Sequence, residues 1–214
     1  KWIKSNLEDK IYLFTILVIS ILLSITIIKN FSSNFLINTI LISSALYLFF
    51  ITLRDFFSKG FKNLAQNTAH FGFSLLILSI LFNSLFSSEI ITNLKVGQTF
   101  ENSKAKIVFE SLSQKEGENY KSIIGNFIVQ DSNGKMENLS PELRIYNQPN
   151  ITTSEADIKT TLLSDKFIVI NLVQNQEFFN VRYQVKPFML WIWISVILIS
   201  FGGLISFVKK EYEK

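Results

Sequence analysis

Four long stretches without a charged residue constrain the fold of this chain more than any other feature. They run from Ile11 to Ile28, from Phe35 to Leu53, from Ala69 to Phe86 and from Phe188 to Val208. Each is about as long as an α-helix must be to cross a hydrocarbon layer of roughly 30 Å. A helix also satisfies its own backbone hydrogen bonds, which lipid cannot do. We therefore predict an α-helical membrane protein with four transmembrane helices.

The basic residues that flank these stretches predict the orientation of the chain. They precede the first stretch, separate the second from the third and follow the fourth: Lys1, Lys4, Lys10, Arg54, Lys59, Lys62, Lys209, Lys210 and Lys214. Only Lys29 lies between the first and second stretches. The positive-inside rule then places both termini on the inner side of a membrane and residues 87–187 on its outer side. At a bacterial inner membrane these sides would be the cytoplasm and the periplasm, and an organellar inner membrane fits equally. Segment 87–187 is nearly neutral, so the excess positive charge faces membrane lipid and does not support a nucleic-acid partner.

The predicted organisation has four parts. They are residues 1–68, two transmembrane helices and an inner amphipathic connector; 69–86, the third transmembrane helix; 87–187, an extracytoplasmic domain; and 188–214, the fourth helix with a cytoplasmic tail. Phe56, Phe57 and Phe61 of the connector suit the membrane interface. No signal-cleavage site follows the first stretch, so we do not interpret it as a cleaved signal peptide. Because the chain begins with Lys, we expect a piece of a longer polypeptide or a processed chain.

Segment 87–187 has the pattern of an inserted all-β domain, either a small sandwich or a barrel. Short runs rich in β-branched and aromatic residues recur in it: "KIVFESL", "SIIGNFIVQD", "KFIVINLV" and "FFNVRYQV". Asn133-Gly134 is a typical signal for a tight hairpin turn. The chain has no cysteine, so the hydrophobic core of the domain must stabilise it without disulfides.

The residues do not assemble a complete catalytic site, and we assign no catalytic residue. His70 is the only histidine and the chain has no cysteine, so a zinc site with several nitrogen or sulfur ligands cannot be built around it. No acidic residue lies in the same stretch as His70, at the inner membrane face, so a Ser-His-Asp triad is not supported either. An ionisable group inside a membrane segment is nevertheless a functional hypothesis by default. Imidazole binds haem iron well, and Ala69 and Gly72 would let a flat macrocycle approach the helix. The alternative is an interfacial histidine that is hydrogen-bonded to Asn67 or Ser74.

Two other groups of residues have competing interpretations. Trp191 and Trp193 either anchor the fourth helix at the membrane interface or dock a flat ligand. Arg144 and Glu155 either pair with each other, bind a partner's charges or belong to a solvated face.

The order of several motifs resembles the C-terminal part of the CcmF/NrfE family of haem lyase subunits. "AHFG" opens the third stretch, "PELRIY" and "TSEADIK" follow in the external segment, and "KPFMLWIW" with a late Gly-Gly closes the chain. The family pattern is A-H-x-G, P-E-x-R-x-Y, T-E-A and K-P-x-x-x-W-I-W. Ser154 and Leu143 depart from it mildly. The resemblance covers roughly Ala69 to Phe207, and the first two stretches match only in position.

The resemblance implies a part in cytochrome c maturation at an inner membrane. The family receives haem from a haem chaperone and helps attach it to apocytochrome c, together with other maturation subunits. It also holds a transmembrane haem b, and His70 matches one axial ligand of its iron. The second ligand would come from outside this chain, from the upstream part of the same protein or from a split partner chain. The chain would then be part of a haem lyase but not a complete enzyme alone.

Two alternatives do not require haem. The first is a non-catalytic membrane assembly or anchoring subunit, whose external β domain binds a partner protein through an exposed apolar patch. The second is a sensor or transporter accessory, which requires a closed pocket in that domain.

Overall fold

The computed structural model describes residues 7–29, 34–58, 63–131, 134–173 and 177–212. The chain divides into two compact units. The helical unit contains Lys1–Phe86 and Phe188–Lys214, and the sandwich contains Ser87–Pro187. We describe each unit by itself.

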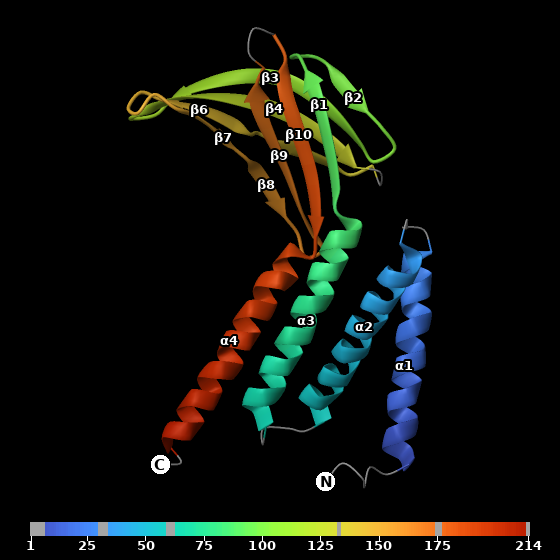
Figure 1. The fold of residues 1–214 in the computed structure, drawn as a ribbon. Coiled ribbons are helices and arrows are strands. Elements are labelled where there is room, and N and C mark those ends of the chain that lie inside the picture. The colour runs from blue at the N-terminus through green and yellow to red at the C-terminus, as the bar shows by residue number, and fades with distance from the viewer. Residues whose placement is uncertain (1–6, 30–33, 59–62, 132–133, 174–176, 213–214) are drawn as a thin grey trace. The chain divides into compact units, whose positions relative to one another are not determined.

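The helical unit contains four long helices, labelled in Figure 1. They are α1 (Leu7–Ile28), α2 (Phe35–Ser58), α3 (Leu64–Phe86) and α4 (Met189–Tyr212). All four are long and apolar enough to cross a membrane. This confirms the predicted transmembrane helices.

The helices extend beyond the apolar stretches at their polar ends. α2 continues through Arg54 to Ser58, and α3 already begins at Leu64, so both ends of the predicted connector are helical. Within α2, the Arg54 guanidinium donates to Asp9 of α1 at 3.1 Å and lies over the Tyr12 ring. Phe57 is exposed, as an interfacial side chain would be, whereas Phe61 lies outside the described residues.

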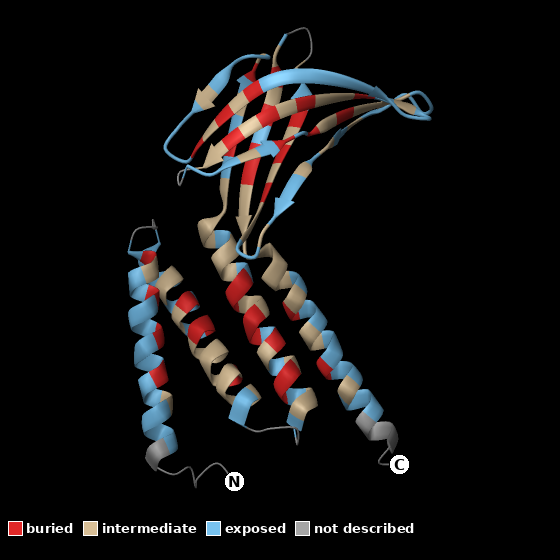
Figure 2. Ribbon diagram, turned by 180° about the vertical axis from the view of Figure 1, so that it is seen from behind, coloured by how far each residue is buried: buried red, intermediate tan, exposed pale blue. Residues whose placement is uncertain are grey.

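The four helices lie in a row. α1 packs on α2, α2 on α3 and α3 on α4, and Figures 1 and 2 both show this order. The buried residues of α1 recur every four positions, and the two in the middle, Ser20 and Ser24, have small side chains between Ile16 and Ile28. Small residues let helix backbones approach closely in lipid, where no hydrophobic driving force brings helices together.

The sandwich is formed by ten antiparallel strands among its described residues. They are β1 (Ser88–Leu94), β2 (Thr99–Glu101), β3 (Ala105–Glu116), β4 (Tyr120–Asp131), β5 (Met136–Leu139), β6 (Glu142–Tyr146), β7 (Thr152–Glu155), β8 (Asp157–Thr160), β9 (Ser164–Leu172) and β10 (Phe179–Pro187). One sheet has the order β1-β10-β9-β8, and the other has β2-β3-β4-β6-β7 with β5 beside β4. This confirms the predicted all-β domain and identifies it as a sandwich.

The turn between β4 and β5 follows the predicted hairpin in the part that is described. Gly134 has φ of 80°, a left-handed conformation that favours glycine. Its N–H donates to the Asp131 carbonyl at 2.9 Å, and Gln130 pairs with Met136 across the turn. Asn133, the other half of the predicted signal, lies outside the described residues.

Three phenylalanines form the centre of the sandwich core. Phe109 and Phe127 are paired on β3 and β4, and their rings stack at 4.3 Å between centroids. Phe179 of β10 meets Phe109 edge-on at 5.6 Å, so these aromatic contacts join the two sheets. Figure 2 shows buried residues alternating along these strands, as a half-buried strand requires.

Truncation of this core should destabilise the sandwich strongly. We expect Phe127→Ala to lower the free energy of unfolding by about 3–5 kcal/mol, because it removes the stacked ring and leaves a cavity. Ile91→Ala, at a side chain that is 60% exposed on β1, should cost no more than about 0.5 kcal/mol. Hydrogen–deuterium exchange of β3 and β4 peptides in the intact chain measures both changes. Equal effects of the two substitutions would contradict this assignment of the core.

Candidate functional site

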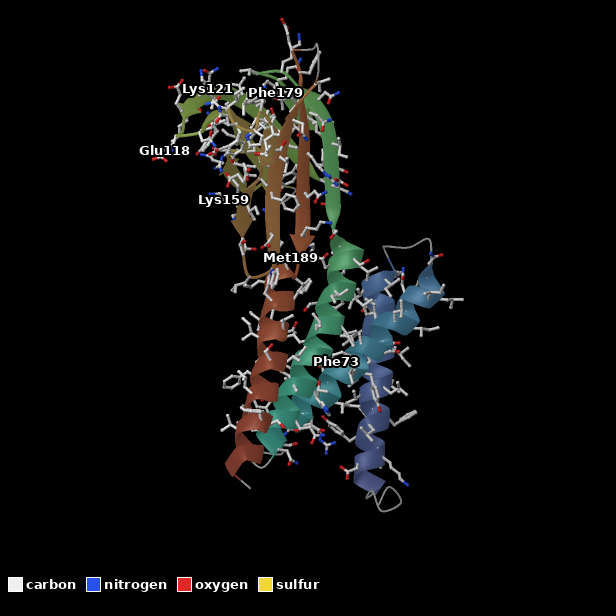
Figure 3. All side chains as sticks on the ribbon, turned by 60° about the vertical axis from the view of Figure 1, so that its left-hand side comes forward. Phe73, Glu118, Lys121, Lys159, Phe179 and Met189 are labelled. Carbon is white, nitrogen blue, oxygen red and sulfur yellow. The ribbon has the colours of Figure 1, made fainter. Side chains whose placement is uncertain are left out.

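His70 lies on a face of α3 that is exposed within the described ranges. The exposed side chains recur at the three- and four-residue spacing of a single helix face: Gln66, His70, Phe73, Ile80 and Ser84. We call these five residues the open face of α3. Figure 3 labels Phe73, which is 54% exposed and lies one turn from His70. The open face therefore combines aromatic, aliphatic and polar groups.

A second face of α3 packs against α2 through polar and aromatic contacts. The Asn67 amide donates to the Asp55 carbonyl at 3.1 Å, and the hydroxyls of Ser74 and Thr52 are hydrogen-bonded at 2.6 Å. The Phe71 ring lies against the rings of α2, with 5.4 Å between its centroid and that of Phe56. These contacts fix the rotation of α3 against α2.

A third face of α3 packs closely against α4. A Cβ atom added at Gly202 would lie 2.8 Å from the Ala69 nitrogen and 2.8 Å from the Ala65 carbonyl oxygen. A Cβ atom added at Gly72 would lie 3.0 Å from Ile199. The prediction that Ala69 and Gly72 open the helix surface beside His70 to a macrocycle is therefore wrong, since α4 covers both residues.

The hydrogen bonds proposed in the alternative interpretation of His70 are not formed among the described residues. Asn67 donates to Asp55, and Ser74 bonds to Thr52 and to the Phe71 carbonyl. Within the described ranges, the His70 ring has no hydrogen bond or ion pair. Its imidazole is therefore available to a ligand from the open face.

No cluster of metal-ligating side chains accompanies His70 in the part of the chain that the structure describes. Those residues contain no group of three or more His, Cys, Asp or Glu side chains that could hold an ion. The site therefore offers a single imidazole. This ligand set suits a metal that is already held by a macrocycle, with one axial position provided here.

The two tryptophans of α4 lie in different surroundings. Trp191 is half-buried, whereas Trp193 is 62% exposed. An exposed indole near the beginning of an apolar helix suits the interfacial role.

Arg144 and Glu155, for which the sequence allowed mutual pairing, have other partners in the structure. Arg144 Nε donates to Glu142 at 3.0 Å, and its guanidinium lies over the Tyr120 ring. Glu155 instead accepts from Thr153 at 3.0 Å. Arg144 and Glu155 therefore do not pair, because Glu142 is nearer along the same strand.

The sandwich also contains a charged cluster that the sequence did not reveal. Lys166 is 8% exposed, and its Nζ lies 3.1 Å from Asp131 and 3.3 Å from Glu137. Lys135 lies 2.8 Å from the same Glu137 oxygen. Burial acts to raise the pKa of Glu137, but the hydrogen bonds from both lysines outweigh it and hold that pKa below its usual range. Burial also raises the pKa of the neighbouring Tyr183 well above its usual value.

This cluster forms one wall of a cavity of about 480 Å³ within the sandwich. Lys104, Asp131, Lys166 and Tyr183 contribute polar groups to it, beside apolar side chains such as Ile90. The cavity is open at its mouth and is not the closed pocket that a small-molecule sensor requires.

The two units together define a class of protein: an integral membrane protein in which a β-sandwich is inserted between the third and fourth helices. Residues 85–187 match the family model described as the CcmF C-terminal beta-sandwich. A solved structure of the cytochrome c haem lyase CcmF has the same fold, with a TM-score of 0.66 at 14% identity. That match covers 95% of this chain and 35% of the solved chain.

Named relatives agree with this class. The cytochrome c-type biogenesis protein CcmF of Pseudomonas aeruginosa is 27% identical over 145 residues, which are 68% of this chain and 22% of the relative. The cytochrome c-type biogenesis protein ccl1 of Rhodobacter capsulatus is 31% identical, with the same coverage of 68% and 22%. The cytochrome c-type biogenesis protein NrfE of Haemophilus influenzae is 25% identical over 178 residues, which are 82% of this chain and 28% of the relative.

These comparisons confirm the resemblance seen in the motifs. The chain belongs to the CcmF/NrfE family of cytochrome c-type biogenesis proteins and corresponds to the C-terminal part of its relatives. It spans about a quarter of the length of these curated relatives. The family and the four apolar helices make it an inner-membrane protein.

The close contact of α3 and α4 gives a prediction with an internal control. Alanine favours a helix over glycine by about 1 kcal/mol, so Gly203→Ala, into open space, should leave stability unchanged or raise it slightly. Gly202→Ala should lower stability by about 1–3 kcal/mol, because its Cβ meets the backbone of α3. Thermal unfolding of both variants in detergent measures the difference. The same sign for both would show that α3 and α4 do not meet at Gly202.

The Glu137 cluster gives a prediction about pH. The folded-state pKa of Glu137 is lowered, so its stabilisation is complete above the unfolded pKa, about 4.3, and is lost as pH falls through the folded pKa. Glu137→Gln should therefore cost roughly 1–3 kcal/mol at pH 7, and this loss should vanish in acid. Circular dichroism of thermal unfolding from pH 3 to 8 measures it.

Glu116→Gln is the control for that experiment, because Glu116 lies at 3.6 Å from Lys121 in a pair that is largely exposed. A pH dependence of Glu137→Gln that matches that of Glu116→Gln would contradict the role of the cluster.

Proposed function

We propose that this chain is the C-terminal portion of a haem lyase subunit for cytochrome c maturation. In this proposal, His70 supplies one axial ligand of a transmembrane haem b, whose second ligand comes from outside the chain. The observation that carries the proposal is the open face of α3, where the His70 imidazole lies on an apolar helix without a hydrogen-bond partner among the described residues. Burial of such a group in lipid alone is costly, so a ligand on this face is favoured.

The residues around His70 fit a haem group. Phe73 and Ile80 are exposed on the same face and offer apolar contact to a macrocycle. Gln66, one turn before His70, adds a polar group near the beginning of the helix. Haem would supply one-electron chemistry when bound, and the imidazole of His70 would hold its iron.

Helices α2 and α4 fix the position and rotation of α3. Asn67 and Ser74 are hydrogen-bonded to α2, and Gly202 brings α4 against the opposite side. An axial ligand must keep its ring orientation, so a helix fixed on two faces is a suitable support. His70 then projects from the open face.

The proposal includes an orientation and partners. The basic flanks favour cytoplasmic termini and a periplasmic sandwich formed by residues 87–187. The upstream part of the same protein, or a split partner chain, would cover the open face. A haem chaperone, apocytochrome c and other maturation subunits are the further partners that this function requires.

One observation favours a second candidate function. Leu162 and Leu163 are exposed on the sandwich, as expected for a non-catalytic assembly or anchoring subunit that binds a partner through an apolar patch. The next experiment separates the two functions, because only the first requires an iron ligand from α3.

The test is an optical spectrum of the chain co-purified with its upstream portion. We expect a reduced b-type spectrum in the wild-type sample and its loss in His70→Ala, because the iron loses an axial ligand. Gln66→Ala, one turn away on the same face, is the matched control and should keep the spectrum. An unchanged spectrum in His70→Ala would assign the ligand to another residue, and a sample without haem would favour the anchoring function.

A further inference from the structure

The turn between β8 and β9 exposes two adjacent leucines. The side chains of Leu162 and Leu163 are 70% and 67% exposed. The residues on either side, Thr161 and Ser164, are uncharged, so the turn is neutral over four positions. A neutral turn with two large exposed aliphatic side chains is unusual for a surface in contact with water.

Strand pairing places this turn near the point where the chain leaves the sandwich for α4. Ser164 pairs with Pro187, the last residue of β10, and α4 begins two residues later at Met189. Adjacent Cα atoms are 3.8 Å apart, and paired ones lie about 5 Å apart, so Leu163 and Met189 are separated by no more than about 17 Å. Connectivity therefore keeps the turn close to where the chain enters the membrane.

The first turns of α4 mark the level of the interface. Trp191 and Trp193 follow Pro187 by four and six residues, and tryptophan is enriched where a helix passes from headgroups to lipid tails. The turn continues past Ser164 in the direction in which β10 runs toward α4, because β9 and β10 are antiparallel. Within the sandwich, Leu162 and Leu163 therefore lie at the same end as the last residue of β10, from which the chain continues into α4.

The backbone at the base of the turn is suited to an apolar environment. The Thr161 N–H donates to the Ser164 carbonyl at 3.0 Å, and the Thr161 hydroxyl donates to the same oxygen at 2.8 Å. The Ser164 N–H donates back to the Thr161 hydroxyl at 3.1 Å. Internal pairing of this kind lowers the cost of placing the turn in lipid, where an unpaired backbone group is expensive.

We propose that Leu162 and Leu163 insert into the outer interfacial layer of the membrane. The occupant of this surface is the lipid bilayer, because chain connectivity holds the turn where the bilayer begins and the turn offers no charge to a protein partner. Lys159, labelled in Figure 3, is exposed on β8 two residues before Thr161, and a long lysine side chain suits the polar headgroup level of an interface. The turn then provides the sandwich with a third attachment to the membrane, besides the chain connections to α3 and α4.

Single-cysteine variants test this proposal directly, since the chain contains no native cysteine. Leu162→Cys and Leu163→Cys, each carrying a nitroxide spin label, are prepared in the full chain in lipid nanodiscs. Leu172→Cys is the matched control, because Leu172 is 49% exposed at the opposite end of the same strand β9. Eight residue steps along a strand place it about 26 Å from Ser164.

Power saturation with oxygen and with a water-soluble nickel complex gives the environment of each label. We expect the labels at positions 162 and 163 to be at least several-fold more accessible to oxygen than to nickel, relative to the label at position 172. Equal ratios at all three positions would place the turn in water and overturn the proposal. Low accessibility to both reagents at positions 162 and 163 would show that protein covers the turn, and would also overturn it.

Discussion

The close contact between α3 and α4 is the constraint on which the rest of the helical unit depends. In lipid, apolar side chains gain nothing by leaving one apolar environment for another, so helices associate through close packing and hydrogen bonds. Gly202 provides the close packing, because a Cβ at this position would overlap the backbone of Ala65 and Ala69. The Thr52–Ser74 hydrogen bond provides the corresponding contact with α2. Together, these two contacts fix the rotation of α3 about its own axis and leave one of its faces uncovered.

That rotation decides what His70 can contact. If α3 were turned by one residue, His70 would point into α4 and the site would be closed. In the observed rotation its imidazole shares a face with Phe73, Ile80 and Gln66, and no described side chain occupies its nitrogen atoms. A histidine held in this way on an apolar helix is best explained by a ligand that approaches from the open face. The family of the chain makes haem the proposed ligand.

The sequence predicted the elements well and their contacts poorly. Length and lack of charge identified the four helices, and alternation with a turn signal identified the sandwich, because both depend on local periodicity. The contacts depend on which faces meet, and a single sequence does not contain this information. Gly72 therefore seemed free to admit a macrocycle but packs on Ile199. Arg144 pairs within its own strand, and Lys166, in the run "KFIVINLV", is buried beside two carboxylates.

Because His70 is the only histidine in the chain, labelling this chain with ¹⁵N-histidine tests directly whether its imidazole binds the haem iron. The chain is produced with ¹⁵N-histidine and assembled with an unlabelled upstream portion, and the low-spin ferric haem is measured by pulsed electron–nuclear double resonance. We expect one strongly coupled ¹⁵N nucleus from an axial imidazole of this chain. A haem signal with ¹⁴N couplings alone would show that His70 does not bind the iron, and would contradict the proposed site.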